Sequence, residues 1–272
     1  MASEPTPRPL DPPSIGNRSL GGTRDAAEPA QRARAGVADI AIPEREDLPP
    51  IGVPPPRYLR GAALDHFLAL RNRVLDQAQR QGVKVIGVSS ARPGEGKTTV
   101  SICLASAFAM ACPQGVLLVD ANLRKPAIHR FYRMPRAPGL ADVIQGDFDW
   151  TRAVTTAHDL PLQVLAAGSR PATSPAELFV SSRFEQTIAA FKSRFDFILV
   201  DTPNLHAYQD AELMGKHFDG TILVVESDRT QLAALHHATR QMEAARIPVL
   251  GLLLNRHKKV LPGFLERYLG VE

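Results

Sequence analysis

Short apolar runs alternate along most of the chain with longer segments in which apolar residues recur every three or four positions. Apolar runs rich in β-branched residues are typical of strands buried on both faces, whereas the longer spacing indicates amphipathic helices. We therefore expect one α/β domain whose mainly parallel, twisted sheet is covered by helices on both faces. The predicted strands are Val83–Ser89, Val116–Asp120, Leu162–Ala166, Phe197–Asp201, Thr221–Glu226 and Val249–Asn255, and the predicted helices are 97–111, 176–194, 208–217 and 230–245.

A further amphipathic helix is predicted at residues 59–80, ahead of the first strand. Its apolar stripe follows the helical period. Two interpretations of this helix stay open, packing against its own domain or contact with another subunit. The stripe consists of Leu64, Phe67, Leu68, Val74, Leu75 and Ala78, with Arg71 among them.

The first part of the chain has a different composition. Twelve of the 23 prolines fall within residues 1–60, where eight arginines balance eight acidic residues. A segment so poor in apolar residues cannot offset its chain entropy by burial. We expect residues 1–56 to form a disordered or polyproline-like tail, residues 57–260 to form the folded domain, and residues 261–272 to form a short amphipathic helix.

Charge and composition exclude several classes of protein. The net charge of +4 comes from scattered rather than massed basic residues, which argues against a dedicated nucleic-acid binder. The sequence shows no apolar stretch near the roughly 20 residues that span a bilayer, and no secretory signal. The two cysteines, Cys103 and Cys112, lack metal spacing and are predicted to be buried thiols of a cytosolic protein, and the histidines form no zinc-site pattern.

A phosphate-binding loop follows the first predicted strand. Residues 91–98 read Ala-Arg-Pro-Gly-Glu-Gly-Lys-Thr, a GxxxxGK[ST] pattern with alanine in the first glycine position. Glycines let backbone N–H groups curl around phosphate oxygens, and the start of the next helix carries partial positive charge. Lys97 is expected to reach the β and γ phosphates and Thr98 to ligate Mg²⁺. The predicted cofactor-binding residues of this loop are Pro93, Gly94, Glu95, Gly96, Lys97, Thr98 and Thr99.

Two aspartates end apolar strands. Asp120 follows Val119, and Asp201 follows Val200. Ligand sites of open α/β sheets lie at the carboxyl ends of the strands, and Mg²⁺ takes one or two carboxylate oxygens directly. We therefore predict that Thr98, Asp120 and Asp201 form a metal site beside the phosphate loop.

Three segments together resemble the bacterial tyrosine kinases (BY-kinases) of capsule and exopolysaccharide biosynthesis, whose P-loop fold is MinD/ParA-like. The segments are the loop at 93–99, Leu117–Pro126 and Ile198–Pro203, and they match the Walker A, Walker A′ and Walker B motifs of that family. The resemblance implies that Lys97 and Asp120 are catalytic, that ATP and Mg²⁺ are the cofactors, and that Asn255 and Arg256 lie where related ATPases recognise adenine.

The sequence departs from the family in three places. Asn122 replaces the second aspartate of the Walker A′ motif, and a neutral amide cannot take a proton at working pH. Only Tyr268 lies near the carboxyl end, where the family carries a tyrosine cluster. One arginine of the family's oligomerisation helix is replaced by Leu68.

The last residues contain an apolar face of their own. Residues 261–269 place five apolar side chains on one side of a helix. Packing on the domain and weak membrane contact are both open for this segment. The five are Leu261, Phe264, Leu265, Tyr268 and Leu269.

These features predict an ATP-dependent protein tyrosine kinase, an autokinase that regulates exopolysaccharide or capsule synthesis and export. The resemblance implies a cytoplasmic protein at the inner face of the cell membrane, activated by a separate membrane chain-length protein (a polysaccharide co-polymerase), with a homo-oligomer left open and no nucleic-acid partner. Two alternatives remain. One is an ATP-binding, nucleotide-switched regulator with little kinase activity, and the other is a MinD/ParA-like ATPase.

Overall fold

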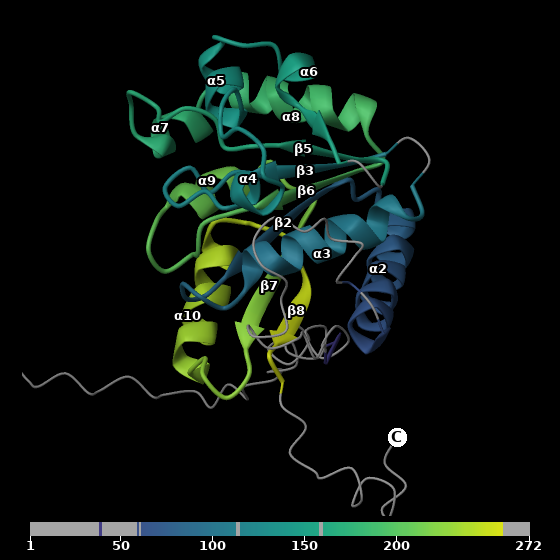
Figure 1. Cartoon of the computed structure of the whole chain (residues 1–272). Coiled ribbons are helices and arrows are strands. Elements are labelled where there is room, and N and C mark those ends of the chain that lie inside the picture. The colour runs from purple at the N-terminus through teal and green to yellow at the C-terminus, as the bar shows by residue number, and fades with distance from the viewer. Residues whose placement is uncertain (1–37, 40–58, 60, 113–114, 158–159, 258–272) are drawn as a thin grey trace, which may run out of the picture. The chain divides into compact units, whose positions relative to one another are not determined.

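One sheet of eight strands runs through the part of the chain that the computed structural model describes, which is residues 38–39, 59, 61–112, 115–157 and 160–257 (Figure 1). The strand order is β1-β8-β7-β2-β6-β3-β5-β4. All neighbours are parallel except β4 and β5. The strands are β1 Ala38–Asp39, β2 Val85–Ser90, β3 Val116–Asp120, β4 Thr155–Thr156, β5 Leu162–Leu165, β6 Phe197–Asp201, β7 Gly220–Glu226 and β8 Val249–Asn255.

Nine helices connect these strands within the described residues. The long ones alternate with the central strands, which gives the parallel crossovers that the sequence pattern predicts. The helices are α2 Gly61–Gln81, α3 Lys97–Ala109, α4 Ile128–Phe131, α5 Leu140–Gln145, α6 Trp150–Ala153, α7 Pro175–Phe179, α8 Ser182–Arg194, α9 Asp210–Gly215 and α10 Leu232–Ala244.

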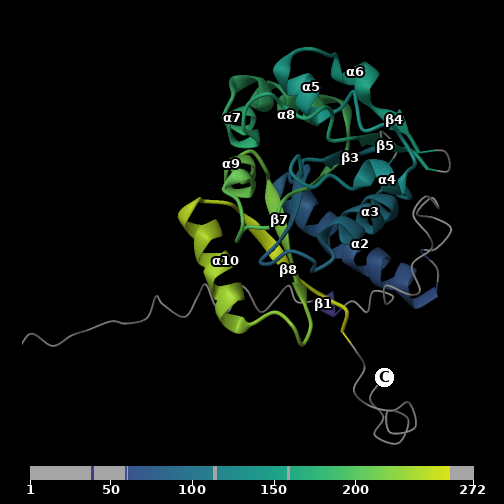
Figure 2. The same ribbon diagram turned by 60° about the vertical axis from the view of Figure 1, so that its left-hand side comes forward.

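The two faces of the sheet carry separate apolar cores. Strand β3 divides its side chains between them, since Val116 and Leu118 join the core under α2 and α3 while Leu117 and Val119 join the core under α5 to α8. Figure 1 and Figure 2 show α3 along one face and α8 along the other. Because both faces are covered, the strand is apolar from Val116 to Val119, and each fully buried large side chain stabilises the fold by about 1.5–3 kcal/mol.

Helix α2 packs onto α3. Phe67, Leu70 and Val74 are buried in the same core as Phe108 of α3. The Arg71 guanidinium donates a 3.2 Å hydrogen bond to the carbonyl of Ala107 near the end of α3. The interpretation that this helix packs on its own domain is therefore confirmed, with α3 as the surface that receives it.

The predicted helix 176–194 is wrong as a single helix. The chain forms α7, leaves the helix at Val180 and starts α8 at Ser182. Ser181 causes the restart, because its hydroxyl donates to the carbonyl of Leu178 at 2.6 Å and accepts from the N–H of Phe184 at 3.3 Å. A serine that caps one helix start in this way competes with continuation of the preceding helix.

The short elements were not predicted from the sequence. Helices α4, α5 and α6 have at most six residues each, and β1 and β4 have two. Strand β1 lies inside the stretch expected to be disordered, where Ala38 pairs with Leu253 and Asp39 with Leu254 of β8. Elements this short contain too few residues to show a period.

Several expectations lie outside the described residues. These are most of the tail at 1–56, the helix at 261–272 and Tyr268. No helix among the described residues has both the length and the apolar character needed to cross a bilayer. Cys103 and Cys112 are buried free thiols, as predicted, and burial raises the pKa of Cys103 to about 12.

Candidate active site

The phosphate loop connects β2 to α3 at the carboxyl edge of the sheet. Gly94 and Gly96 have φ values of +89° and +90°, which side chains with a Cβ rarely adopt. Gly96 is the residue that precedes the first turn of α3, which begins at Lys97. The N–H groups of that first turn have no carbonyl partner inside the helix. The loop and helix start therefore have the form of an anion-binding cradle.

Two residues from distant parts of the chain hold this loop. The hydroxyl of Thr230 donates to one carboxylate oxygen of Glu95, and the backbone N–H of Arg92 donates to the other at 2.8 Å. The side-chain amide of Asn255 donates to the backbone carbonyl of Glu95 at 2.7 Å. The Glu95 carboxylate is thus used inside the protein, and only the backbone of this residue faces the cradle as a candidate phosphate contact.

Asp120 and Asp201 lie side by side at the ends of β3 and β6. Their Cα atoms are register partners and both side chains are fully buried. The Thr98 hydroxyl donates to Asp201 Oδ2 at 2.7 Å, and the Ser101 hydroxyl donates to Oδ1 at 3.2 Å. The three residues predicted to form a metal site, Thr98, Asp120 and Asp201, are therefore brought to one edge of the sheet.

Burial dominates the electrostatics of this pair. It raises the pKa of Asp120, and the neighbouring Asp201 raises it further. Burial also raises the pKa of Asp201, while the Lys97 ammonium and the hydroxyls of Thr98 and Ser101 act in the opposite direction. Two adjacent buried carboxylates favour a bound cation, because a cation offsets both their desolvation and their mutual repulsion.

Asp120 also anchors the loop that follows it. Its Oδ2 accepts the N–H groups of Ala127 and Ile128, both at 3.0 Å, and its Oδ1 accepts the N–H of Asn122 at 3.2 Å. A carboxylate has about four acceptor positions, two on each oxygen. Oδ2 is therefore filled from within the protein, whereas Oδ1 keeps one position for a ligand, a proton or a metal ion.

The predicted adenine residues have partners within the protein. Asn255 holds the phosphate loop through its amide nitrogen, and its Oδ1 is buried without a hydrogen-bond partner in the described structure. The Arg256 guanidinium donates to a carboxylate oxygen of Glu226 at 2.8 Å. Arg124, four positions after the Walker A′ aspartate, donates hydrogen bonds to the carboxylate of Asp210. The role of Asn255 and Arg256 at adenine stays a prediction, and the structure adds a loop-holding contact to Asn255.

Sequence reasoning missed Ser101 and Thr230. Ser101 lies three positions after Thr98, so the helical period puts both hydroxyls on the face toward Asp201. That spacing was a usable signal. Thr230 offers none, because the 135 positions between it and Glu95 are bridged only by the fold.

The geometry defines a P-loop nucleotide-binding protein. A family model described as "Cellulose biosynthesis protein BcsQ" matches residues 83–259. "Tyrosine-protein kinase YwqD" of Bacillus subtilis (strain 168) is 30% identical over 194 residues, which are 71% of this chain and 81% of that protein. The chain therefore belongs to the family of bacterial tyrosine-protein kinases and BcsQ-like proteins. Some curated relatives are much longer, and the matched part of this chain spans 25% of one of them.

Solved structures give the same fold. The "chimerical protein CapA2B2" has a TM-score of 0.74 at 24% identity, covering 85% of this chain and 99% of that one. The "septum site-determining protein MinD complexed with Mg-ADP" from Pyrococcus horikoshii OT3 has a TM-score of 0.56 at 23% identity, covering 68% and 76%. The predicted P-loop fold of the MinD/ParA kind, with a mainly parallel sheet, is confirmed.

Proposed function

We propose that the protein is an ATP-dependent protein tyrosine kinase that regulates exopolysaccharide or capsule synthesis and export. The carrying observation is the meeting of the phosphate loop, Thr98 and the two buried carboxylates at one sheet edge. Family membership supports this assignment, since the chain is 30% identical to a tyrosine-protein kinase over most of that relative's length. The same membership supports the link to polysaccharide synthesis.

The donor set fits Mg²⁺ and a nucleotide triphosphate. Oxygen ligands from a hydroxyl and carboxylates suit this hard cation, and buried carboxylates with raised pKa values gain from its charge. In this proposal Thr98 and Asp201 hold the metal ion, with Asp120 beside them. Lys97 and the N–H groups of residues 93–99 bind the phosphates. Bound Mg²⁺·ATP supplies the γ-phosphoryl group and neutralises charge on it during transfer.

Asp120 orients the accepting hydroxyl. The free acceptor position on its Oδ1 allows it to receive a hydrogen bond from a tyrosine O–H, while three backbone N–H groups fix the carboxylate in place. Burial and Asp201 raise its pKa, which makes it a better proton acceptor than an ordinary aspartate. Positioning and charge stabilisation then account for most of the acceleration.

The accepting tyrosine comes from Tyr58 or Tyr268, from another copy or from another protein. Within the described residues, the Tyr132 hydroxyl is buried and the Tyr208 ring packs under the Arg124 guanidinium at 4.2 Å. The buried Tyr132 hydroxyl is therefore not presented as an acceptor, and the Tyr208 ring is held by Arg124. We further propose a membrane chain-length protein as activator and a location at the inner face of the cell membrane.

Asn122 favours a second candidate, a nucleotide-switched regulator with little kinase activity. Its side-chain oxygen accepts the N–H of Lys125 at 3.3 Å, and its own N–H donates to Asp120. The residue shapes the loop but offers no carboxylate. A MinD/ParA-like positioning role rests on the shared fold alone.

Incubation with labelled ATP, Mg²⁺ and a tyrosine-containing acceptor separates these candidates. We expect labelled phosphotyrosine with the native protein and none with Lys97→Ala. Asn122→Asp tests the departure from the family, and a several-fold rise in label would show that the amide limits transfer. Binding of ATP without any label, in the native protein and in Asn122→Asp alike, would contradict the kinase and support the regulator.

A further inference from the structure

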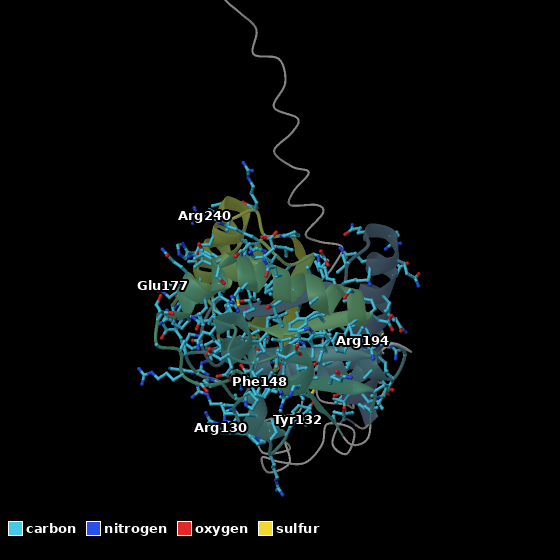
Figure 3. The ribbon with its side chains drawn as sticks, turned by 90° about the horizontal axis from the view of Figure 1, so that it is seen from above. Arg130, Tyr132, Phe148, Glu177, Arg194 and Arg240 are labelled. Carbon is cyan, nitrogen blue, oxygen red and sulfur yellow. The ribbon has the colours of Figure 1, made fainter. Side chains whose placement is uncertain are left out.

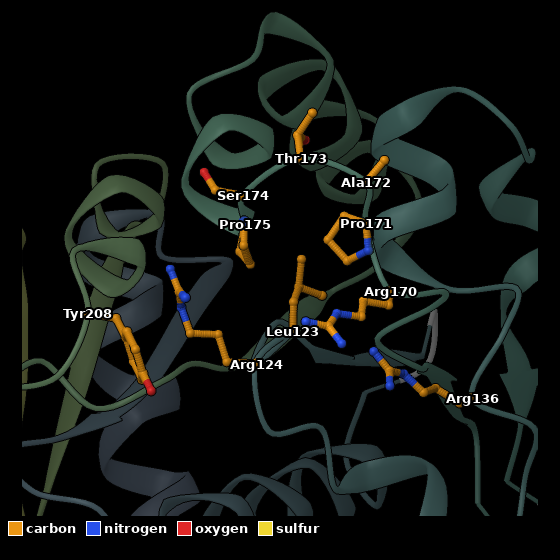
Figure 4. Close-up of a pocket in the computed structure, with 10 residues that line it drawn as sticks. All are labelled: Leu123, Arg124, Arg136, Arg170, Pro171, Ala172, Thr173, Ser174, Pro175 and Tyr208. Atoms are coloured by element: carbon orange, nitrogen blue, oxygen red, sulfur yellow. The ribbon is translucent and has the colours of Figure 1, made fainter.

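Besides the phosphate loop, a cavity opens at the carboxyl edge of the sheet, next to the carboxylate pair. Its volume is about 670 Å³, and it lies between the loop after β3, the segment before α7 and Tyr208 (Figure 4). The residues that line it include Leu123 and Arg124, which follow Asp120 by three and four positions. The cavity therefore adjoins the proposed phosphoryl-transfer site without being part of the phosphate loop.

Three arginines line this cavity, and we call it the arginine pocket (Arg124, Arg136, Arg170 and the seven further residues drawn in Figure 4). Arg124 is neutralised by Asp210, with nitrogen–oxygen distances of 2.6 and 3.1 Å, and it stacks on Tyr208. Within the described structure, Arg136 donates one hydrogen bond, from its Nε to the carbonyl of Gly168 at 2.8 Å. Arg124 thus forms a rigid wall, while Arg136 keeps its terminal nitrogens for a ligand.

The charges of Arg136 and Arg170 are not compensated. Neither has a carboxylate partner among the residues that the structure describes. Figure 4 shows the two guanidinium groups converging on the same space beside Leu123. Like charges that converge in a cavity raise the energy of the empty site, and a bound anion removes that cost.

The backbone that carries Arg170 is fixed. Gly168 has a φ of +88°, and a Cβ there would meet Asp142 Oδ2 at 2.5 Å. The same Asp142 oxygen accepts the N–H groups of Gly139 at 2.7 Å and Ser169 at 3.0 Å. Arg170 therefore leaves a braced turn, which fixes the start of its exposed side chain at the edge of the cavity.

We propose that the arginine pocket binds acidic side chains next to the accepting tyrosine of the polypeptide substrate. The cavity is larger than one carboxylate needs, it has two uncompensated guanidinium groups, and it lies beside the carboxylate expected to orient the tyrosine hydroxyl. The Arg124–Asp210 pair shows the fork geometry in which guanidinium groups hold carboxylates. The identity of the polypeptide as the kinase substrate rests on the proposed function.

Binding of two matched peptides tests this proposal without any phosphoryl transfer. One peptide carries a single tyrosine flanked by glutamates, and the other has glutamines in their place. We expect the native protein to bind the glutamate peptide about tenfold more tightly, and Arg170→Glu to bring the two affinities within about twofold of each other. Fluorescence anisotropy of labelled peptides measures both, and an unchanged affinity of Arg170→Glu for ATP shows that the variant is folded.

Arg194→Glu is the matched control. Arg194 is the last residue of α8 and is exposed, and Figure 3 places it at the opposite side of the view from Glu177 of α7. Arg194→Glu alters the net charge of the protein by the same amount as Arg170→Glu. We expect it to leave the preference for the glutamate peptide intact. A loss of preference as large as in Arg170→Glu would show that overall charge, not the pocket, attracts the peptide, and would overturn the proposal.

Measuring both binding and phosphorylation of the two peptides separates a failure of the arginine pocket from a failure of the kinase activity. Preference that depends on Arg170, without any phosphotyrosine, would support the pocket and contradict the kinase. Equal binding and equal phosphorylation of both peptides would support the kinase and overturn the pocket. Binding of inorganic phosphate that depends on Arg170, without binding of the glutamate peptide, would assign the pocket to a free anion and overturn the peptide as its ligand.

Discussion

Two loops leave the same edge of the sheet but are held in different ways. The loop at 91–96 after β2 depends on Thr230 and Asn255, which come from the far end of the domain. The loop at 121–127 after β3 is held by Asp120, which accepts three N–H groups within eight positions of itself. The first loop therefore depends mainly on distant residues, whereas the backbone of the second is held mainly by its own aspartate, with one distant contact from Arg124 to Asp210.

The difference shows which contacts position each part of the site. Glycines at positive φ make the phosphate loop adaptable, so that distant hydrogen bonds are needed to restrict it. The loop after β3 contains the carboxylate that both fixes the backbone and faces the reaction. A change of Asp120 should therefore reduce phosphoryl transfer and loosen the loop after β3 together. Changes of Asn255 or Thr230 should instead weaken nucleotide binding, each by a different amount.

The largest effect is expected for Asp120→Ala. Without the carboxylate, phosphotyrosine formation should fall by about 10³-fold, within the range for a general base. The N–H groups of Ala127 and Ile128 should also exchange faster with solvent deuterium, because their acceptor is gone. Asp120→Asn is the control, since its amide oxygen can still accept hydrogen bonds from some of these N–H groups. Unchanged exchange at both positions in Asp120→Ala would contradict the local anchoring.

Asn255→Ala should have the next largest effect. Loss of its hydrogen bond to the Glu95 carbonyl should weaken the binding of both ATP and tripolyphosphate by about tenfold, since one buried hydrogen bond is worth about 1 kcal/mol or more. Titration calorimetry measures both ligands. Asn72→Ala on the exposed side of α2 serves as the control. Weaker ATP binding with unchanged tripolyphosphate binding would instead indicate that Asn255 acts on adenine alone.

A smaller effect is expected for Thr230→Val. This change keeps the shape but removes the hydroxyl that donates to Glu95, whose carboxylate still accepts the N–H of Arg92. ATP affinity should fall by about threefold, as for the partial loss of one hydrogen bond. Thr239→Val in α10 is the matched control, because the described hydrogen bond of its hydroxyl is to the carbonyl of His236 in the same helix. Equal affinities of the two variants would show that the phosphate loop needs no support from Thr230.

The smallest effect is expected for removal of residues 1–56. None of the contacts described for either loop comes from this segment, so ATP affinity should stay within about twofold of the full chain. The deletion also removes β1, whose two residues pair with the outer edge of β8. A much larger loss of affinity would show that the segment supports β8 and, through Asn255, the phosphate loop.

Much of the fold could be predicted because its strands are buried on both faces. The bounds of β3, β6 and β8 agree with the sequence pattern residue for residue, since each strand ends at a polar residue, Asp120, Asp201 or Asn255. The amphipathic helix predicted at 59–80 differs from α2 by two positions at its start and one at its end. Because buried positions must be apolar, such segments show a clear hydrophobic pattern.

The remainder depends on contacts that no local pattern records. The break between α7 and α8 depends on one serine hydroxyl, and a serine within a helical period can either lie inside one helix or cap the start of a new one. Lys97, Thr98, Asp120 and Asp201 could be picked from short motifs. The loop-holding role of Asn255 and the convergence of Arg136 with Arg170 could not, because they arise from loops that meet only after the sheet has formed.

The hydrogen bond between Asn255 and Glu95 also has a consequence for the order in which the protein is made. Its two partners are 160 positions apart, so the phosphate loop leaves the ribosome long before the residue that completes it. A nascent chain that stops short of β8 carries every Walker residue and still lacks this bond. We therefore expect a chain that ends before β8 to bind ATP more weakly than the full chain.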